Sequence, residues 1–222
     1  MKSTKRLILS FIVLFTGIWA MVASQQGDFS TYRVLKPLTT ILIILIALFS
    51  WTKENKIYNR YITIALCFCL VGDVLLLYDE YFLFGLTSFL VAHIFFTYAC
   101  STIYGFSRNF WSFLVLSSVY VAYFFYLKSD LKAYMLPVAV YMVAIIVMNW
   151  QAVALYLRDN KNTYLLIAFA ALLFTLSDSM IAYHKFKAPF RLADFFILST
   201  YWLAIYMFAF TSYFIKDKLV QK

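Results

Sequence analysis

Glycine and proline are scarce in this chain, with five glycines and three prolines among 222 residues. Pro37, Pro137 and Pro189 each lie at or just before the start of a long apolar run, where a missing backbone N–H does little harm to a helix. The interrupted, glycine- and proline-rich helices with which ion-coupled transporters build their midplane sites are therefore not predicted. Long uninterrupted helices are expected instead.

Histidine, cysteine and charged residues are also sparse: two histidines, three cysteines, and 13% Asp, Glu, Lys and Arg. With only His93 and His184, a histidine-rich metal site is not expected. Cys67 and Cys69 are two residues apart, so on a helix they point to different faces and suit neither a disulfide nor a metal clamp. The sequence contains no nucleophile elbow, phosphate-binding glycine loop or zinc-protease motif.

Hydrophobic residues make up 64% of the chain, which is typical of a polytopic membrane protein. A helix needs ~20 residues to cross ~30 Å of hydrocarbon. On this basis we expect an all-α integral membrane bundle of eight transmembrane helices that forms a single domain over residues 1–222. The predicted spans are 7–24, 36–52, 61–78, 81–104, 110–127, 133–157, 163–183 and 191–215.

The distribution of Lys and Arg predicts the orientation of these spans. Twelve of the 19 basic residues lie on the side of the N-terminus: Lys2, Lys5, Arg6, Lys53, Lys56, Arg60, Arg108, Arg158, Lys161, Lys216, Lys218 and Lys222. The other seven are Arg33, Lys36, Lys128, Lys132, Lys185, Lys187 and Arg191. We therefore expect a multi-pass protein of the cell (inner) membrane with both termini cytoplasmic. The basic segment 185–191 runs against this pattern.

The net charge of +9 follows mainly from these residues at the ends of the spans, and it favours contact with anionic lipid headgroups. No basic helix or basic-aromatic motif accompanies it, so no nucleic-acid partner is predicted. Membrane lipids are the expected surroundings. The oligomeric state does not follow from the sequence.

Two carboxylates lie inside apolar spans, Asp73 in span 61–78 and Asp178 in span 163–183. Even the most lenient scale assigns a charged side chain at membrane depth a cost of ~2.5–3.5 kcal/mol. Each Asp lies roughly 20 Å from the N-terminal side of its span, so both are expected at similar depth. Such residues indicate a functional site.

Further polar residues lie in the same group of spans. His93 and Thr97 are one turn apart, Ser177 adjoins Asp178, and Tyr141 and Asn149 lie in span 133–157. They predict a polar lumen between the third, fourth, sixth and seventh spans. Serine and threonine also serve as ordinary contacts between membrane helices. A buried His93 bonded to a neighbouring helix is an equally good interpretation of that residue.

Two carboxyl groups in one dry pocket would supply a general acid and a general base at neutral pH. This arrangement favours an enzyme. A proton-linked carrier of lipids or small molecules would use the same aspartates without bond cleavage. A receptor-like or scaffolding bundle, in which they only pack, is the third possibility.

Several short motifs resemble the YhhN-like lysoplasmalogenase family. They are Lys36-Pro37-Leu38-Thr39, Gly72-Asp73-Val74-Leu75-Leu76, Phe84-Gly85-Leu86 with Phe89 and Ala92-His93, Pro137 and Tyr141 before Met148, and Ser177-Asp178-Ser179-Met180-Ile181-Ala182 with Phe186. The resemblance covers nearly the whole chain in the expected order. One departure lies after Tyr201, where Ile205 occupies a position at which the family would have Gln.

The resemblance implies an eight-helix hydrolase that cleaves the vinyl ether bond of lysoplasmalogens, which are single-chain ether phospholipids, to a fatty aldehyde and a glycerophospho-alcohol. It implies that Asp73 and Asp178 are the catalytic residues and that no metal or cofactor is required. The residues expected to bind substrate or support the aspartates are His93, Lys36, Tyr141, Ser177, Thr97, Asn149 and Tyr201.

Overall fold

The computed structural model describes residues 2–216. Met1 and residues 217–222, which include Lys218 and Lys222 of the charge count above, lie outside the described residues. The long helices are α1 (Lys2–Gln25), α2 (Phe29–Phe49), α3 (Lys56–Leu75), α4 (Phe82–Tyr104), α5 (Phe110–Leu131), α6 (Met135–Arg158), α7 (Asn162–Ala182) and α8 (Ala193–Thr211). Three short 3₁₀ turns, η1 (Asp79–Tyr81), η2 (Lys132–Tyr134) and η4 (Ser212–Phe214), and one π-helical segment, η3 (Tyr183–Lys187), extend them.

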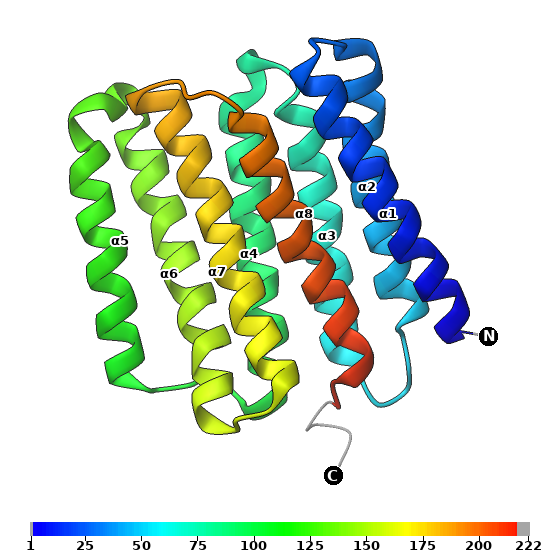
Figure 1. Cartoon of the computed structure of the whole chain (residues 1–222). Helices are drawn as coiled ribbons and strands as arrows, with labels where there is room; N and C mark the ends of the chain where they lie inside the picture. The colour runs from blue at the N-terminus through cyan, green and yellow to red at the C-terminus, as the bar shows by residue number, and fades with distance from the viewer. Residues whose placement is uncertain (1, 217–222) are drawn as a thin grey trace.

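The described chain is all-helical, with seven continuous helical segments long and apolar enough to cross a membrane. One of these, Phe110–Arg158, contains both α5 and α6, which η2 joins without a break. Figure 1 shows these two helices side by side. The predicted fold class, an all-α multi-pass membrane bundle, is therefore confirmed. That each of the eight helices makes its own crossing stays a prediction.

The helices form a flattened bundle with α5 at one edge and α1 and α2 at the other, while α3, α4, α7 and α8 occupy the middle (Figure 1). The most extensive pairings are α3 with α4, α7 with α8, and α1 with α2. The first turn of α1 and the last turn of α8 lie at the same end of the bundle (Figure 1). The loops that join α3 to α4, α5 to α6, and α7 to α8 lie at the opposite end.

The start of α2 differs from the prediction. Gly27, with a φ of +73°, ends the preceding helical stretch, and Asp28 caps α2 by accepting a hydrogen bond of 3.1 Å from the backbone N–H of Thr31. Hydrogen bonds from Ser30 and Thr31 lower the pKa of the Asp28 carboxyl to about 2. The helix thus begins seven residues before position 36. Pro37 lies inside α2 and not at its start, so that expectation was wrong.

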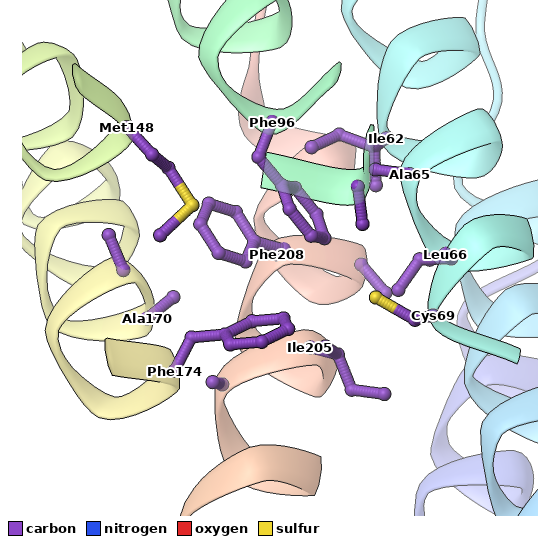
Figure 2. Packing of buried hydrophobic residues seen from close by; sticks show 14 of the residues in the cluster. Ile62, Ala65, Leu66, Cys69, Phe96, Met148, Ala170, Phe174, Ile205 and Phe208 are labelled. Carbon is purple, nitrogen blue, oxygen red and sulfur yellow. The ribbon is translucent and has the colours of Figure 1, made fainter. Parts of the chain in front are cut away.

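Aromatic rings from three helices form the centre of the core, as Figure 2 shows. Phe96 on α4 stacks on Phe208 of α8, with ring centres 4.2 Å apart, and contacts Phe174 of α7 at 6.0 Å. All three side chains are fully buried. Since lipid chains are as apolar as these rings, close packing and not exclusion from water holds such a core together. Phe174 connects this core to the polar residues described below.

Glycine allows α3 and α4 to approach closely. A Cβ atom on Gly72 would lie 2.6 Å from the ring of Phe89, and one on Gly85 would lie 2.6 Å from Leu76. Small residues at a membrane helix interface let the backbones come together in this way. The contact places Phe89 of α4 directly against the residue that precedes Asp73.

Candidate functional site

Asp178 of α7 is held by two side chains from neighbouring helices. Tyr141 of α6 donates its hydroxyl to Oδ2 of Asp178 over 2.9 Å, and Nε2 of His93 on α4 lies 3.0 Å from the same oxygen. Nε2 of His93 also lies 3.0 Å from the Tyr141 hydroxyl. A carboxylate can only accept, so an ionised Asp178 requires the proton of the His93 imidazole to be on Nε2. Both donors use Oδ2, which leaves Oδ1 for other partners.

A cavity lies beside this triad. Its walls come from α4, α5, α6, α7, η3 and Leu76, which directly follows α3, and aliphatic and aromatic side chains dominate them. Among the described residues that line it, Asp178 is the only one with a charged side chain. The side chain of Asp178 is 10% exposed, and that of His93 behind it is fully buried. One carboxyl group therefore faces an apolar chamber.

Asp73 of α3 lies in a second polar pocket. Its Oδ2 accepts a hydrogen bond of 2.5 Å from the Thr40 hydroxyl of α2 and one of 2.9 Å from the Tyr201 hydroxyl of α8. Lys36 lies one turn before Thr40, is buried, and is close enough for its ammonium group to attract the Asp73 carboxylate. Asp73 itself is 1% exposed. Three helices thus converge on this carboxylate.

An aromatic layer separates the two carboxylates. Phe89 lines the cavity, and its ring contacts Tyr201 at 5.7 Å and Phe174 at 6.1 Å between ring centres. Phe174 in turn lies 4.6 Å from the ring of His93 and 5.4 Å from that of Tyr201. Asp73 is not among the cavity-lining residues, and in the described part of the chain no hydrogen bond joins it to Asp178. The predicted single polar lumen is therefore wrong.

Three other residues expected at the site have different contacts. Thr97 donates to the backbone carbonyl of His93 over 2.9 Å and lines a separate groove between α4 and α6, because one helical turn rotates it by about 40° from His93. Ser177 donates to the carbonyl of Ile197 over 3.0 Å and so ties α7 to α8. Asn149 donates to the Thr175 hydroxyl over 2.6 Å. Only the Asn149 contact leads to the cavity, since Thr175 lines it.

Two residues at the site carried no role in the sequence-based prediction. Thr40 bonds Asp73 although 33 residues separate them, so no local pattern connects the two. Its position four residues after Lys36, on the same face of a helix, was the only available signal. Phe89 belongs to one of the motifs that resemble the family, but an aromatic residue in an apolar helix by itself predicts only a position in the core. Ile205, the departure in α8, is fully buried in the core.

No group of three or more His, Cys, Asp or Glu side chains that could hold a metal ion occurs in residues 2–216. The polar groups gathered here are carboxyl, imidazole, phenol and hydroxyl groups, together with one ammonium group. Their chemistry is the acceptance and donation of protons.

The chain is similar in sequence to several known proteins. Residues 31–212 match the sequence model of the YhhN family. Human "Lysoplasmalogenase TMEM86A" is 33% identical over 148 residues, which are 64% of this chain and 61% of that protein. Human "Lysoplasmalogenase TMEM86B" is 29% identical over 168 residues, 73% of this chain and 68% of that protein.

A "Lysoplasmalogenase homolog" of Dictyostelium discoideum is 30% identical over 108 residues, 41% of this chain and 35% of that protein. The chain thus matches between about a third and about two thirds of the length of these relatives. No solved structure matches it. Because the family match extends over most of the residues that form the bundle, including both aspartates, the chain belongs to the YhhN family.

Proposed function

We propose that this protein is a membrane hydrolase that cleaves the vinyl ether bond of lysoplasmalogens. The observation that carries the proposal is the single carboxyl group, Asp178, in the wall of an otherwise uncharged and largely apolar cavity. The names of three relatives, two lysoplasmalogenases and a lysoplasmalogenase homologue, supply the substrate class. The mostly aliphatic and aromatic walls of the cavity suit a hydrocarbon chain.

The reaction needs an acid and a carboxylate. A proton is added to the outer alkene carbon, which leaves an oxocarbenium ion at the carbon bonded to the ether oxygen. Water attacks that carbon and loses a proton, and the resulting hemiacetal breaks down to a fatty aldehyde and the glycerophospho-alcohol. One water is consumed and the catalyst's proton is returned. The division of roles between two carboxyl groups parallels that in glycoside hydrolysis.

We assign the proton donor to Asp178. Tyr141 and His93 both occupy Oδ2, so the proton is carried on Oδ1, the oxygen left for the substrate. When that proton has moved to carbon, the new carboxylate keeps two hydrogen-bond donors that stabilise its charge. It then accepts a proton from the attacking water. His93 and Tyr141 act as positioning residues for this carboxyl.

Asp73 supplies the second carboxylate in this proposal. It lies behind Phe89, so it does not touch substrate in the observed arrangement. Negative charge held by Thr40 and Tyr201 in a dry interior still stabilises an oxocarbenium ion on the other side of that ring, because such a medium screens charge weakly.

The carrier alternative receives less support. Carriers place their sites at discontinuous helices, whereas α3 and α7 are continuous through Asp73 and Asp178 within the described chain.

The proposed setting is the cell's inner membrane, with the whole chain as a single eight-helix domain and both termini in the cytoplasm. The Lys and Arg distribution supports that orientation.

The test is release of fatty aldehyde from a lyso vinyl ether phospholipid by the protein purified in detergent. The matched control lipid has a saturated alkyl ether at the same position, which cannot be protonated to an oxocarbenium ion. Aldehyde from the first lipid and none from the second is the expected result. A carrier or a scaffold would give aldehyde from neither lipid.

A further inference from the structure

A cationic segment lies at the end of the bundle where the Lys and Arg distribution predicts few cations. The segment η3 directly continues α7, and it carries Lys185 and Lys187 on either side of Phe186. Phe186 lines the cavity, together with Ala182 and Asp178, which lie one and two turns earlier on the same helical stretch. The segment thus contributes to the wall of the cavity. π-helical turns of this kind occur frequently at functional sites.

Lys185 does not line the cavity itself, but it contacts a residue that does. Its Nζ is 4.6 Å from the centre of the Phe82 ring, and Phe82 also lines the cavity. The same ammonium group forms an ion pair of 2.7 Å with Asp79 of η1. The Lys185 side chain is 29% exposed, whereas the Asp79 side chain is 97% exposed. A pair with so exposed a carboxylate contributes little to stability, so another anion can take the carboxylate's place at low cost.

Lys187 forms an equivalent pair on the other side of the segment. Its Nζ lies 2.7 Å from Oδ2 of Asp130 and 5.1 Å from the centre of the Tyr126 ring. Tyr126 is exposed and is not among the cavity-lining residues. Both lysines of this short segment therefore pair with an Asp. Lys185 also contacts a ring that lines the cavity, whereas Lys187 contacts a ring that does not.

We propose that Lys185 is the phosphate-binding residue of the substrate site, and that the lipid phosphate displaces the Asp79 carboxylate from it. The inference rests on the proposed function. Lys185 follows Asp178 by seven residues, roughly 10 Å along the helix, and its flexible four-carbon stem lets the ammonium reach back toward the carboxyl. The glycerol unit bridges the vinyl ether at Asp178 and the phosphate at Lys185.

The geometry also assigns the end of the molecule at which the headgroup lies. The start of α4, which is Phe82, and the end of α7, which η3 continues with Lys185 and Phe186, lie at the end of the bundle opposite to the start of α1 and the end of α8 (Figure 1). The headgroup is therefore held at that end, and the hydrocarbon chain extends from it along α5, α6 and α7. This accounts for a basic segment on the side that otherwise carries fewer cations.

The test compares a lyso vinyl ether phospholipid with the corresponding 1-alkenylglycerol, which lacks the phosphate headgroup. Lys185→Gln is expected to raise KM for the phospholipid at least tenfold and to leave kcat/KM for the alkenylglycerol within twofold. Lys185→Arg should restore most of the loss. Lys187→Gln is the matched control and should change neither substrate by more than twofold.

The aspartates that pair with the two lysines give a second test, in which one substitution is expected to lower KM for the phospholipid. Asp79→Asn removes the competing carboxylate from Lys185, so KM for the phospholipid should fall, whereas Asp130→Asn should leave it unchanged. Equal effects of Lys185→Gln on both substrates, equal effects of the two lysine variants, or a rise in KM for Asp79→Asn would each overturn the inference.

A binding measurement separates this inference from the proposed function. Native mass spectrometry in detergent can compare the uncleavable 1-alkyl lysophospholipid with 1-alkylglycerol on wild-type protein and on the Lys185→Gln and Lys187→Gln variants. A preference for the phospholipid that only Lys185→Gln abolishes supports the phosphate site even if no aldehyde is ever released. Absence of that preference in the wild-type protein refutes the site, whether or not the vinyl ether is cleaved.

Discussion

The hydroxyl of Tyr141 donates a hydrogen bond of 2.9 Å to Oδ2 of Asp178, which joins α6 to α7 at the wall of the cavity. The oxygen that receives this bond is also the one that faces His93, so the orientation of the carboxyl is set from two neighbouring helices. A carboxyl group fixed in this way presents its other oxygen to whatever fills the cavity. The proposed chemistry depends on that orientation.

The aspartates should be essential. Asp178→Asn keeps the size of the side chain but can neither deliver nor accept the proton, and Asp73→Asn removes the negative charge that stabilises the oxocarbenium ion, so each should lower kcat by ~10²-fold or more. Aldehyde release by purified variants, with monodisperse elution from a sizing column as the check on folding, measures this. A variant that kept more than about a tenth of the wild-type rate would contradict the role given to that residue.

Loss of a positioning residue should be milder. Tyr141→Phe removes one donor to Asp178 but preserves the ring, and His93→Ala removes the other donor, so we expect each to lower kcat by roughly tenfold while substantial activity remains. KM for the lipid should change little, because neither residue is assigned to binding. If the His93→Ala variant kept the wild-type kcat, the role of His93 would be packing only.

The dependence of activity on pH should form a bell. If one carboxyl must hold a proton while the other is ionised, kcat/KM rises and then falls with pH, and the two apparent pKa values belong to the pair. The assay is aldehyde release over the pH range in which the protein stays folded, with EDTA present. Loss of activity in EDTA that zinc restores, or a rate that climbs steadily into alkali, would show that another mechanism operates.

Gly72→Ala should disturb both packing and activity. The added methyl group meets the Phe89 ring at 2.6 Å, and that ring is confined by Phe174 and Tyr201, so an overpacking cost of ~1–3 kcal/mol is expected. Because Phe89 also lines the cavity, kcat/KM should fall. Thermal unfolding in detergent and the aldehyde assay measure the two effects.

The control for Gly72→Ala is Gly17→Ala in α1, where the nearest atom, in the Trp202 ring, lies 3.4 Å from the added Cβ. That contact is ordinary, so stability and activity should stay near wild type. If both substitutions had the same effect, the close approach of α3 and α4 would not be the cause.

Some features of this protein were predictable because they depend on local composition. Hydropathy reports whether a stretch of about 20 residues prefers lipid, so the helical membrane bundle and the unusual status of Asp73 and Asp178 followed from the sequence. The start of α2 could not be predicted from hydropathy alone. Gly27 and Asp28 place it earlier than hydropathy indicates, because a backbone angle and a hydrogen bond, not polarity, define that boundary.

The sequence by itself determined that the chain folds as apolar helices with a few buried polar groups, since each helix satisfies its own backbone within the membrane. Only the tertiary structure decided how those groups pair. Tyr201 reaches Asp73 across 128 positions, and Phe89 lies between that pocket and the cavity of Asp178. Such pairings depend on how each helix is rotated against its neighbours. That rotation results from the close packing of side chains such as Phe89 on Gly72, which no periodicity within one helix reveals.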